Sequence, residues 1–107
     1  MPNIFEHIPE DLAAEDFLAL IATTDLKLER IVSQGHATPP GEWLDQEREE
    51  WVILLKGSAG LLIEGEPQPR TLKPGDYLHL PARQRHRVEW TLADTETVWL
   101  ALHFVAG

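Results

Sequence analysis

The stretch that decides the fold reads GEWLDQEREEWVILLKG at residues 41–57 and resumes as KPGDYLHLPARQRHRVEW at residues 73–90. The apolar run at residues 51–55 is typical of a strand that is covered on both faces. The KPGD sequence at residues 73–76 places proline second and glycine third, as a type II turn requires. Residues 86–91 alternate between two faces, which predicts another strand. This part of the chain therefore predicts short strands joined by tight turns.

The flanking sequence adds strands on both sides and one helix. Residues 26–33 and 97–105 each have the pattern of a strand, and residues 61–64 return from the turn that follows residue 55. A short strand is expected near residues 42–44. Before residue 25, Pro9 and two acidic residues open a predicted amphipathic helix, whose apolar face consists of Ala14, Phe17, Leu18 and Ile21. We therefore expect an N-terminal extension with a short helix at residues 1–25, followed by an all-β barrel or sandwich at residues 26–107.

Composition narrows the class of protein. The chain has 107 residues, which fits one domain, and its formal net charge of −9 opposes binding to nucleic acid or to an anionic membrane. There are no cysteines, which excludes disulfides, thiolate metal sites and cysteine nucleophiles. The apolar runs are too short to span a bilayer, and the N-terminus does not resemble a secretion signal. A cytoplasmic location is the default expectation.

Several turns and polar residues together resemble the cupin family. The second cupin motif, G-x5-P-x-G-x2-H-x3-N, is matched by Gly75, Pro81 and His86 at the family spacing. Arg83 stands where the motif has glycine, and Trp90 stands where it has asparagine. The resemblance implies a double-stranded β-helix, also called a jelly-roll barrel.

The first cupin motif, G-x5-H-x-H-x3–4-E-x6-G, is only half matched. Glu50 and Gly57 fit its second half, but the two histidine positions carry other residues. With the shorter spacer these are Leu44 and Gln46, and with the longer spacer they are Trp43 and Asp45. The WLDQ sequence at residues 43–46 also resembles a subgroup of small single-domain bacterial cupins of unassigned function.

The resemblance implies a metal site inside the barrel. In the family, the motif histidines and glutamate hold a divalent metal such as Zn, Fe, Mn or Ni. The ligands retained here would be Glu50 and His86, with Gln46 or Asp45 completing the set. Three further histidines, His36, His79 and His103, lie in segments whose facing the sequence leaves open. The metal site implied is therefore a degenerate one.

Without a metal, Glu50 and His86 are expected to form a carboxylate–imidazole pair in which each favours the charged form of the other. Arg83, in the loop at the barrel mouth, is a candidate for binding an anionic ligand with its guanidinium group. Trp43 and Trp90 are candidates for an aromatic wall around a small, partly apolar ligand. These residues predict a small-molecule pocket.

Two classes of function follow from this pattern. The first is a cupin barrel that binds a small molecule in its interior and carries a degenerate metal site. The alternative is a metal-dependent cupin enzyme, such as an oxygenase, isomerase or lyase, that acts on a small organic substrate, for which an anionic one is a candidate. The strand face with Trp51, Ile53 and Leu55 needs a cover, which the N-terminal helix or a second copy of the chain would provide. We therefore also expect a homodimer.

Overall fold

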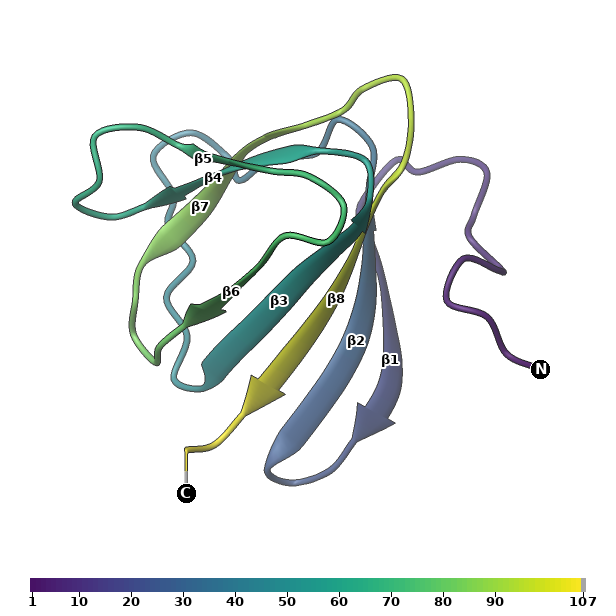
Figure 1. Cartoon of the computed structure of the whole chain (residues 1–107), viewed down its shortest axis with the longest axis horizontal. Coiled ribbons are helices and arrows are strands. Elements are labelled where there is room, and N and C mark those ends of the chain that lie inside the picture. Colours follow the sequence, from purple (N-terminus) through teal and green to yellow (C-terminus); the bar gives the residue numbers. More distant parts are fainter. Residues whose placement is uncertain (107) are drawn as a thin grey trace.

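Eight antiparallel strands form two facing sheets in the computed structural model, which describes residues 1–106 (Figure 1). One sheet has five strands in the order β1-β2-β8-β3-β6, and the other has three in the order β5-β4-β7. Their bounds are β1 Asp16–Ala22, β2 Leu26–Ser33, β3 Glu49–Lys56, β4 Ala59–Ile63, β5 Arg70–Leu72, β6 Tyr77–Leu80, β7 His86–Thr91 and β8 Thr97–Phe104. The predicted all-β barrel is confirmed. Over residues 1–106 we find no helix long and apolar enough to cross a membrane.

Strand β3 lies between β8 and β6 and carries the core. Its even-numbered side chains point inward and its odd-numbered ones outward, so that Val52 and Leu54 are buried between the sheets while Trp51 and Ile53 are half-buried on the outside. The core continues from Val52 and Leu54 into Leu61 of β4 and into Trp99 and Ala101 of β8. Because Glu50 precedes Val52 by two residues, its side chain points into the barrel as well.

Two of the motif glycines shape turns. Gly75 has φ of 94°, and the amide of Asp76 donates to the carbonyl of Lys73 at 2.9 Å, which agrees with the predicted turn. Gly57 has φ of 88°, and a β-carbon there would lie only 2.8 Å from the Thr97 Cα. A side chain at residue 57 would therefore combine backbone strain with a clash against the start of β8.

The predicted N-terminal helix is wrong, because residues 16–22 form the edge strand β1. This strand pairs with β2 from Asp16 opposite Val32 to Ala22 opposite Lys27, with a register shift between Ala19 and Ile21. A segment that is apolar at nearly every position suits a strand as well as a helix, and pairing with the otherwise open edge of β2 outweighs a weak local helix preference. The sheet consequently begins before residue 26. The short strand expected at 42–44 is reduced to one bridge between Leu44 and His86.

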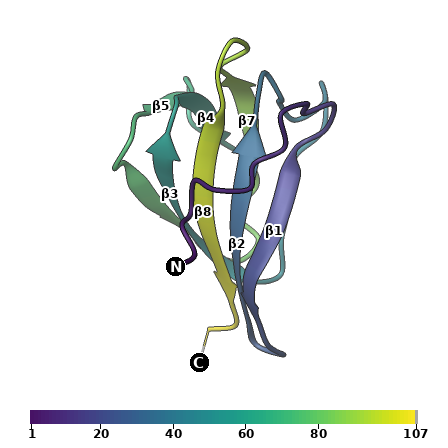
Figure 2. The same cartoon turned by 90° about the vertical axis from the view of Figure 1, so that its right-hand side faces the viewer.

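The segment before β1 covers the outside of the five-stranded sheet instead of a helix. Figure 2 shows it crossing β8 and β2 on the outer face. The side chain of Arg30 on β2 is 2 % exposed beneath it and donates to the backbone carbonyls of Ile4, Glu6 and His7. Arg30 also contacts Asp16 on β1 at 3.4 Å. This buried arginine therefore fixes the N-terminal segment against the sheet.

Candidate functional site

A cavity of about 280 Å³ lies inside the barrel. Apolar residues from both sheets form most of its wall, among them Ile31, Val52, Leu61, Val88 and Trp99. The polar and charged side chains of the wall come from β2, β3, β7, β8 and the segments before β1 and before β3, and they are Glu15, Glu29, Thr38, Glu42, Gln46, Glu50, His86 and His103. A second hollow of about 290 Å³ lies beside β5 and β6 and has neither a histidine nor a glutamate in its wall.

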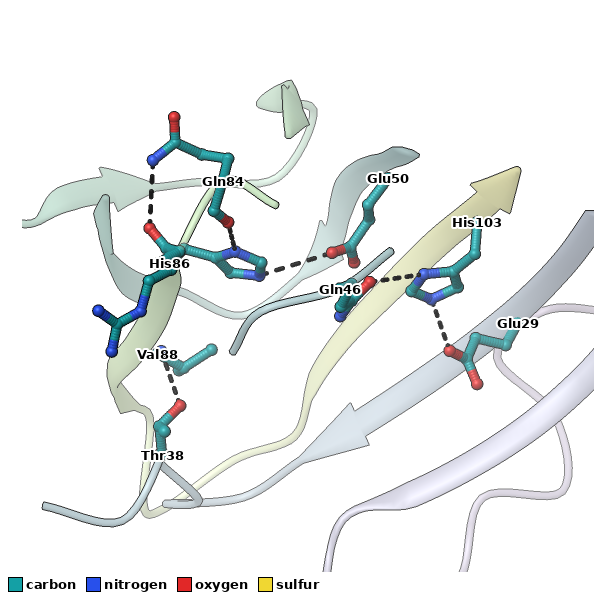
Figure 3. A network of polar contacts seen from close by, with 9 residues as sticks. Glu29, Thr38, Gln46, Glu50, Gln84, His86, Val88 and His103 are labelled. Atoms are coloured by element: carbon teal, nitrogen blue, oxygen red, sulfur yellow. Dashed lines mark hydrogen bonds and ion pairs between the residues drawn. The ribbon is translucent and has the colours of Figure 1, made fainter. Parts of the chain in front are cut away.

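Glu50 of β3 and His86 of β7 meet in the cavity wall (Figure 3). Glu50 Oε1 lies 3.6 Å from His86 Nε2, which is too long for a hydrogen bond. Both residues are buried, Glu50 being 8 % exposed and His86 4 %. Glu50 Oε1 is a buried oxygen with no hydrogen-bond partner in residues 1–106. The fold therefore brings two polar groups together and leaves one of them unsatisfied.

The other nitrogen of His86 fixes the orientation of its ring. His86 Nδ1 lies 2.9 Å from the carbonyl oxygen of Gln84. A carbonyl oxygen only accepts, so Nδ1 is the donor in this contact. In the neutral ring Nε2 then carries a lone pair, and this lone pair faces Glu50.

His103 of β8 forms a second polar group in the same wall. Its Nε2 lies 2.8 Å from Glu29 Oε2 on β2, and its Nδ1 lies 3.2 Å from Gln46 Oε1 (Figure 3). Glu29 is 5 % exposed and also contacts the ammonium group of Lys27 at 3.3 Å. Since His103 is the cross-strand partner of Glu50, the two carboxylate–histidine pairs lie side by side.

Burial raises the pKa of the Glu50 carboxyl above its usual value of 4.5. The charges of His103 and His86 act in the opposite direction and lower this pKa, and the nearby Glu29 adds to the increase. His86 does favour the ionised form of Glu50, as expected, but the loss of hydration has the larger effect on the pKa. For Glu49, at the rim, hydrogen bonds have a larger effect than burial. The Ala82 amide and the His79 ring hydrogen-bond to Glu49 and lower its pKa.

Arg83 does not reach the cavity. Its guanidinium group contacts Asp45 at 3.4 Å and Glu47 at 3.2 Å on the outside, and its side chain is 62 % exposed. Its backbone has φ of 66°, the left-handed conformation that a glycine at this motif position adopts without strain. The structure thus gives the Arg83 side chain no place in the cavity wall, where it was predicted to bind an anion.

Trp90 also lies outside the cavity, although Trp43 is part of its wall. The pairing of β7 with β4 shifts register between Gly60 and Leu61, opposite Trp90 and Val88. This irregularity reverses the alternation that a regular strand would continue. Val88 therefore lines the cavity as expected, whereas the Trp90 ring packs over Gly60 and Thr91 is buried. The prediction that Trp90 faces inward with His86 is wrong.

Comparison with known families and structures agrees with this architecture. The sequence matches the family described as "Cupin domain" over residues 30–103. The chain belongs to the cupin family. No curated protein matches it.

Solved structures of other proteins are similar to this cupin over most of its length. One from Ralstonia eutropha JMP134, which carries the name "putative mannose-6-phosphate isomerase", is 47 % identical with a TM-score of 0.95, covering 99 % of this chain and 98 % of that one. A cupin superfamily protein from Desulfitobacterium hafniense DCB-2 is 16 % identical with a TM-score of 0.75, over 92 % and 84 % of the two chains, and it shows the fold alone. The DMSP lyase DddQ from Ruegeria pomeroyi DSS-3 is 26 % identical with a TM-score of 0.69. That match covers 84 % of this cupin but only 46 % of the lyase.

The structure also decides which residues of this cupin occupy the histidine positions of the first motif. Both residues of the shorter spacer, Leu44 and Gln46, line the cavity, whereas of the longer spacer only Trp43 does, because Asp45 points outward to Arg83. The shorter spacer therefore applies. An apolar side chain and an amide stand in place of two imidazoles, and the amide oxygen of Gln46 is already in contact with His103.

Of the three histidines that the sequence leaves open, only His103 reaches the cavity. His36 accepts the amide of Gln34 in a loop, and His79 contacts Glu49 on the outer side of β6. Glu29 is a site residue that the sequence reasoning did not single out. The sequence contained an indication of this position. Glu29 and Ile31 are two residues apart on β2 and therefore share a face, and a carboxylate on the same face as an apolar side chain indicates an inward polar group.

The donors available for a metal ion are few. Among residues 1–106, no group of three or more histidine, cysteine, aspartate or glutamate side chains is arranged to hold one. Glu50 Oε1 and His86 Nε2 fit as two donors, because donors at about 2.1 Å from one ion lie roughly 3.0–3.5 Å apart, close to the observed 3.6 Å. His103 has both ring nitrogens in contact with other residues. The site therefore offers two free donors.

Proposed function

We propose that this cupin binds a small organic molecule inside the barrel, with the Glu50–His86 pair as its main polar contact. The observation that carries the proposal is the unpartnered Glu50 Oε1 in the wall of the 280 Å³ cavity. A buried carboxylate oxygen without a partner costs free energy, which a ligand that donates a hydrogen bond would recover. Apolar walls around a few converging polar groups are typical of small-molecule sites.

A second candidate is an enzyme that uses Glu50 and His86 for proton transfer. The raised pKa of Glu50 brings its protonated and ionised forms closer in population near neutral pH than for an ordinary glutamate. The adjacent lone pair of His86 Nε2 gives the proton a second acceptor within the same cavity. The name of the 47 % identical Ralstonia protein is that of an isomerase, a class in which protons are commonly moved by such groups.

A divalent metal is the cofactor that the family implies. Glu50 and His86 would hold it, with His86 oriented by its contact with Gln84 in the manner of a metal-ligating histidine. Such an ion would supply Lewis-acid polarisation of a bound oxygen atom. Because Leu44 and Gln46 replace two imidazoles, we expect weak binding, with open positions left to water or to the organic ligand.

The test of binding is a two-dimensional NMR titration of the labelled protein with a set of small polyols, amines, alcohols and carboxylic acids. Compounds that enter the barrel will shift the indole resonance of Trp99 and the ring resonances of His86, since both residues line the cavity. A Glu50→Gln/His86→Ala variant should lose these shifts. A matched control is Glu49→Gln/His79→Ala, which removes a contacting pair at the rim. Shifts confined to the outer surface, or none with any compound, would overturn the proposed function.

Metal binding is tested on the same two variants by mass-spectrometric metal analysis and by calorimetry with Zn²⁺, Mn²⁺, Fe²⁺ and Ni²⁺. We expect weak binding that the Glu50/His86 variant loses and the Glu49/His79 variant keeps. Equal binding by wild type and the Glu50/His86 variant would place the metal elsewhere. No binding of any ion would remove the metal-dependent alternative and leave the small-molecule site.

A second copy of the chain is the partner that we propose for β1. This strand lies at the edge of its sheet, and four of its apolar side chains are 42–59 % exposed: Phe17, Leu18, Leu20 and Ile21. An exposed apolar edge strand readily pairs with a further strand. Leu18→Lys should therefore shift a dimer to monomer in analytical ultracentrifugation, whereas Tyr77→Lys at the opposite edge should not. A wild-type protein that is monomeric at about 100 µM would contradict the proposal.

A further inference from the structure

The gap between Glu50 and His86 calls for a group that donates to both. The Glu50 Oε1 atom accepts hydrogen bonds when Glu50 is ionised, and His86 Nε2 accepts them when the ring is neutral, since Nδ1 then holds the hydrogen that is donated to the Gln84 carbonyl. In these protonation states the two atoms, 3.6 Å apart, are both acceptors with no hydrogen between them. A ligand that fits here must bring its own donors, and a protonated amine has two or three of them on one atom.

The charge of the cavity wall favours a cation. Its charged side chains include four glutamates but no lysine or arginine, in the part of the chain that the structure describes. Glu29 is paired with Lys27 and His103, and Glu15 accepts from the Ser33 hydroxyl. Glu42 lies exposed at the rim, which leaves Glu50 as the buried carboxylate with an open oxygen. Arg87 on β7 directs its guanidinium to backbone carbonyls of the 38–42 loop.

The remainder of the wall suits an apolar group attached to the amine. Trp99 and Trp43 line the cavity with Phe17 and a set of aliphatic side chains. Aromatic faces also attract a cation once it is shielded from water. Since a cavity of 150 Å³ holds benzene, about 280 Å³ has room for a molecule of roughly ten non-hydrogen atoms. The net charge of −9 attracts cations and repels anions over a longer range.

We propose that the ligand of this cupin is a small organic amine, whose ammonium group lies between Glu50 Oε1 and His86 Nε2 while its apolar part packs against Trp99. This inference rests on the proposed function of the barrel as a small-molecule site, and it names the class of molecule. Among the described residues, the same wall has no lysine or arginine to pair with a phosphate or a carboxylate. We therefore expect a phosphorylated sugar to bind in the metal-free interior more weakly than an amine, although a similar protein bears the name of an isomerase acting on one.

The experiment compares three probes of similar shape and different charge and adds one phosphorylated sugar. The probes are 2-phenylethylamine, 2-phenylethanol, phenylacetate and mannose 6-phosphate, titrated at pH 7.5 with a chelator present so that no metal occupies the site. Binding is measured by calorimetry, and its location by the Trp99 indole resonance in the NMR spectrum. The titrations are repeated with Glu50→Gln, which keeps the size of the side chain, and with Glu49→Gln as the matched control at the rim.

We expect the amine to bind about tenfold to a hundredfold more tightly than the alcohol, as a charged hydrogen bond implies, and neither anion to bind inside. Glu50→Gln should bring the amine to the affinity of the alcohol, and Glu49→Gln should leave the ratio unchanged. Equal or tighter binding of the alcohol or of an anion, with a Trp99 shift, overturns the preference for a cation but supports a site in the barrel. No Trp99 shift with any of the four probes also overturns it, and the proposed function is then decided by the wider compound set.

Discussion

Two neighbouring glutamates should respond to neutralisation with opposite signs. Glu50 is buried, has an unpartnered oxygen and has a raised pKa, whereas Glu49 receives hydrogen bonds from Ala82 and His79 and has a lowered pKa. We expect Glu50→Gln to stabilise the metal-free protein at pH 7.5 and Glu49→Gln to destabilise it. The substitutions are chemically identical and adjacent in the chain, so each serves as the control for the other.

The magnitude for Glu50 follows from its missing partner. A buried acceptor left unsatisfied costs about 1–3 kcal/mol, and the introduced amide is neutral and can donate to His86 Nε2. We therefore expect a gain of about 1–3 kcal/mol in the free energy of unfolding. For a domain of this size that corresponds to roughly 4 °C in Tm for each kcal/mol.

The dependence on pH fixes the sign. Because the folded state holds the Glu50 proton more tightly than the unfolded state, wild-type stability falls as pH rises from about 4.5 through the higher folded pKa. The advantage of Glu50→Gln should thus be small at pH 4 and largest above the folded pKa. For Glu49 the stabilising contribution is present above pH 4.5 and is lost as pH falls through the lowered folded pKa, so the deficit of Glu49→Gln should shrink in acid.

Thermal unfolding followed by circular dichroism, with a chelator present, checks both variants between about pH 2.5 and pH 8, a range that covers both titrations. A lower Tm for Glu50→Gln at pH 7.5 would refute the reasoning, because it would show that ionised Glu50 has a partner in the folded protein. A gain that stays constant across the whole pH range would refute it too, since the effect would then not come from the charge.

Two further substitutions test how the barrel is held together. Arg30→Met should lower the free energy of unfolding by about 2–4 kcal/mol and expose the N-terminal segment to proteases, because three backbone carbonyls lose their buried donor. Arg70→Met removes one exposed ion pair and should change the free energy of unfolding by less than about 0.5 kcal/mol. Equal losses for the two variants would contradict the role of Arg30 in fixing the N-terminal segment. Gly60→Ala should cost about 1–3 kcal/mol, because a β-carbon there would collide with the Trp90 ring. Combining it with Trp90→Leu should recover much of this loss in chemical denaturation, and full additivity of the two losses would show that the ring is not the obstacle.

The barrel could be predicted because its signals are local. The turn at residues 73–76, the apolar run at 51–55 and the motif spacings around Glu50 and His86 each specify nearby backbone, and the structure agrees with them. The prediction of an N-terminal helix was wrong because it, too, used only local signals. Residues 16–22 have an ambiguous local pattern, and the open edge of β2 decides their conformation from a distance.

The residues of the site could be predicted only in part from the sequence. The sequence identified Glu50 and His86 as partners, while the open choice between Gln46 and Asp45 depended on which side of one loop faces inward. Trp90 was misplaced because the register shift beside Gly60 leaves no clear mark in the sequence, and a strand changes its facing at such a point.

By itself, then, the sequence determined the all-β barrel, the cupin membership and the meeting of Glu50 with His86, because regular spacing along strands carries this information. Only the tertiary structure added His103 and Glu29 to the site. These two residues are 74 positions apart in the sequence, but their strands β8 and β2 are neighbours in one sheet. It also decided that Glu50 keeps an unpartnered oxygen and that Arg83 points away from the cavity. Burial and partners depend on every element packed around a side chain, and no local pattern in the chain contains them.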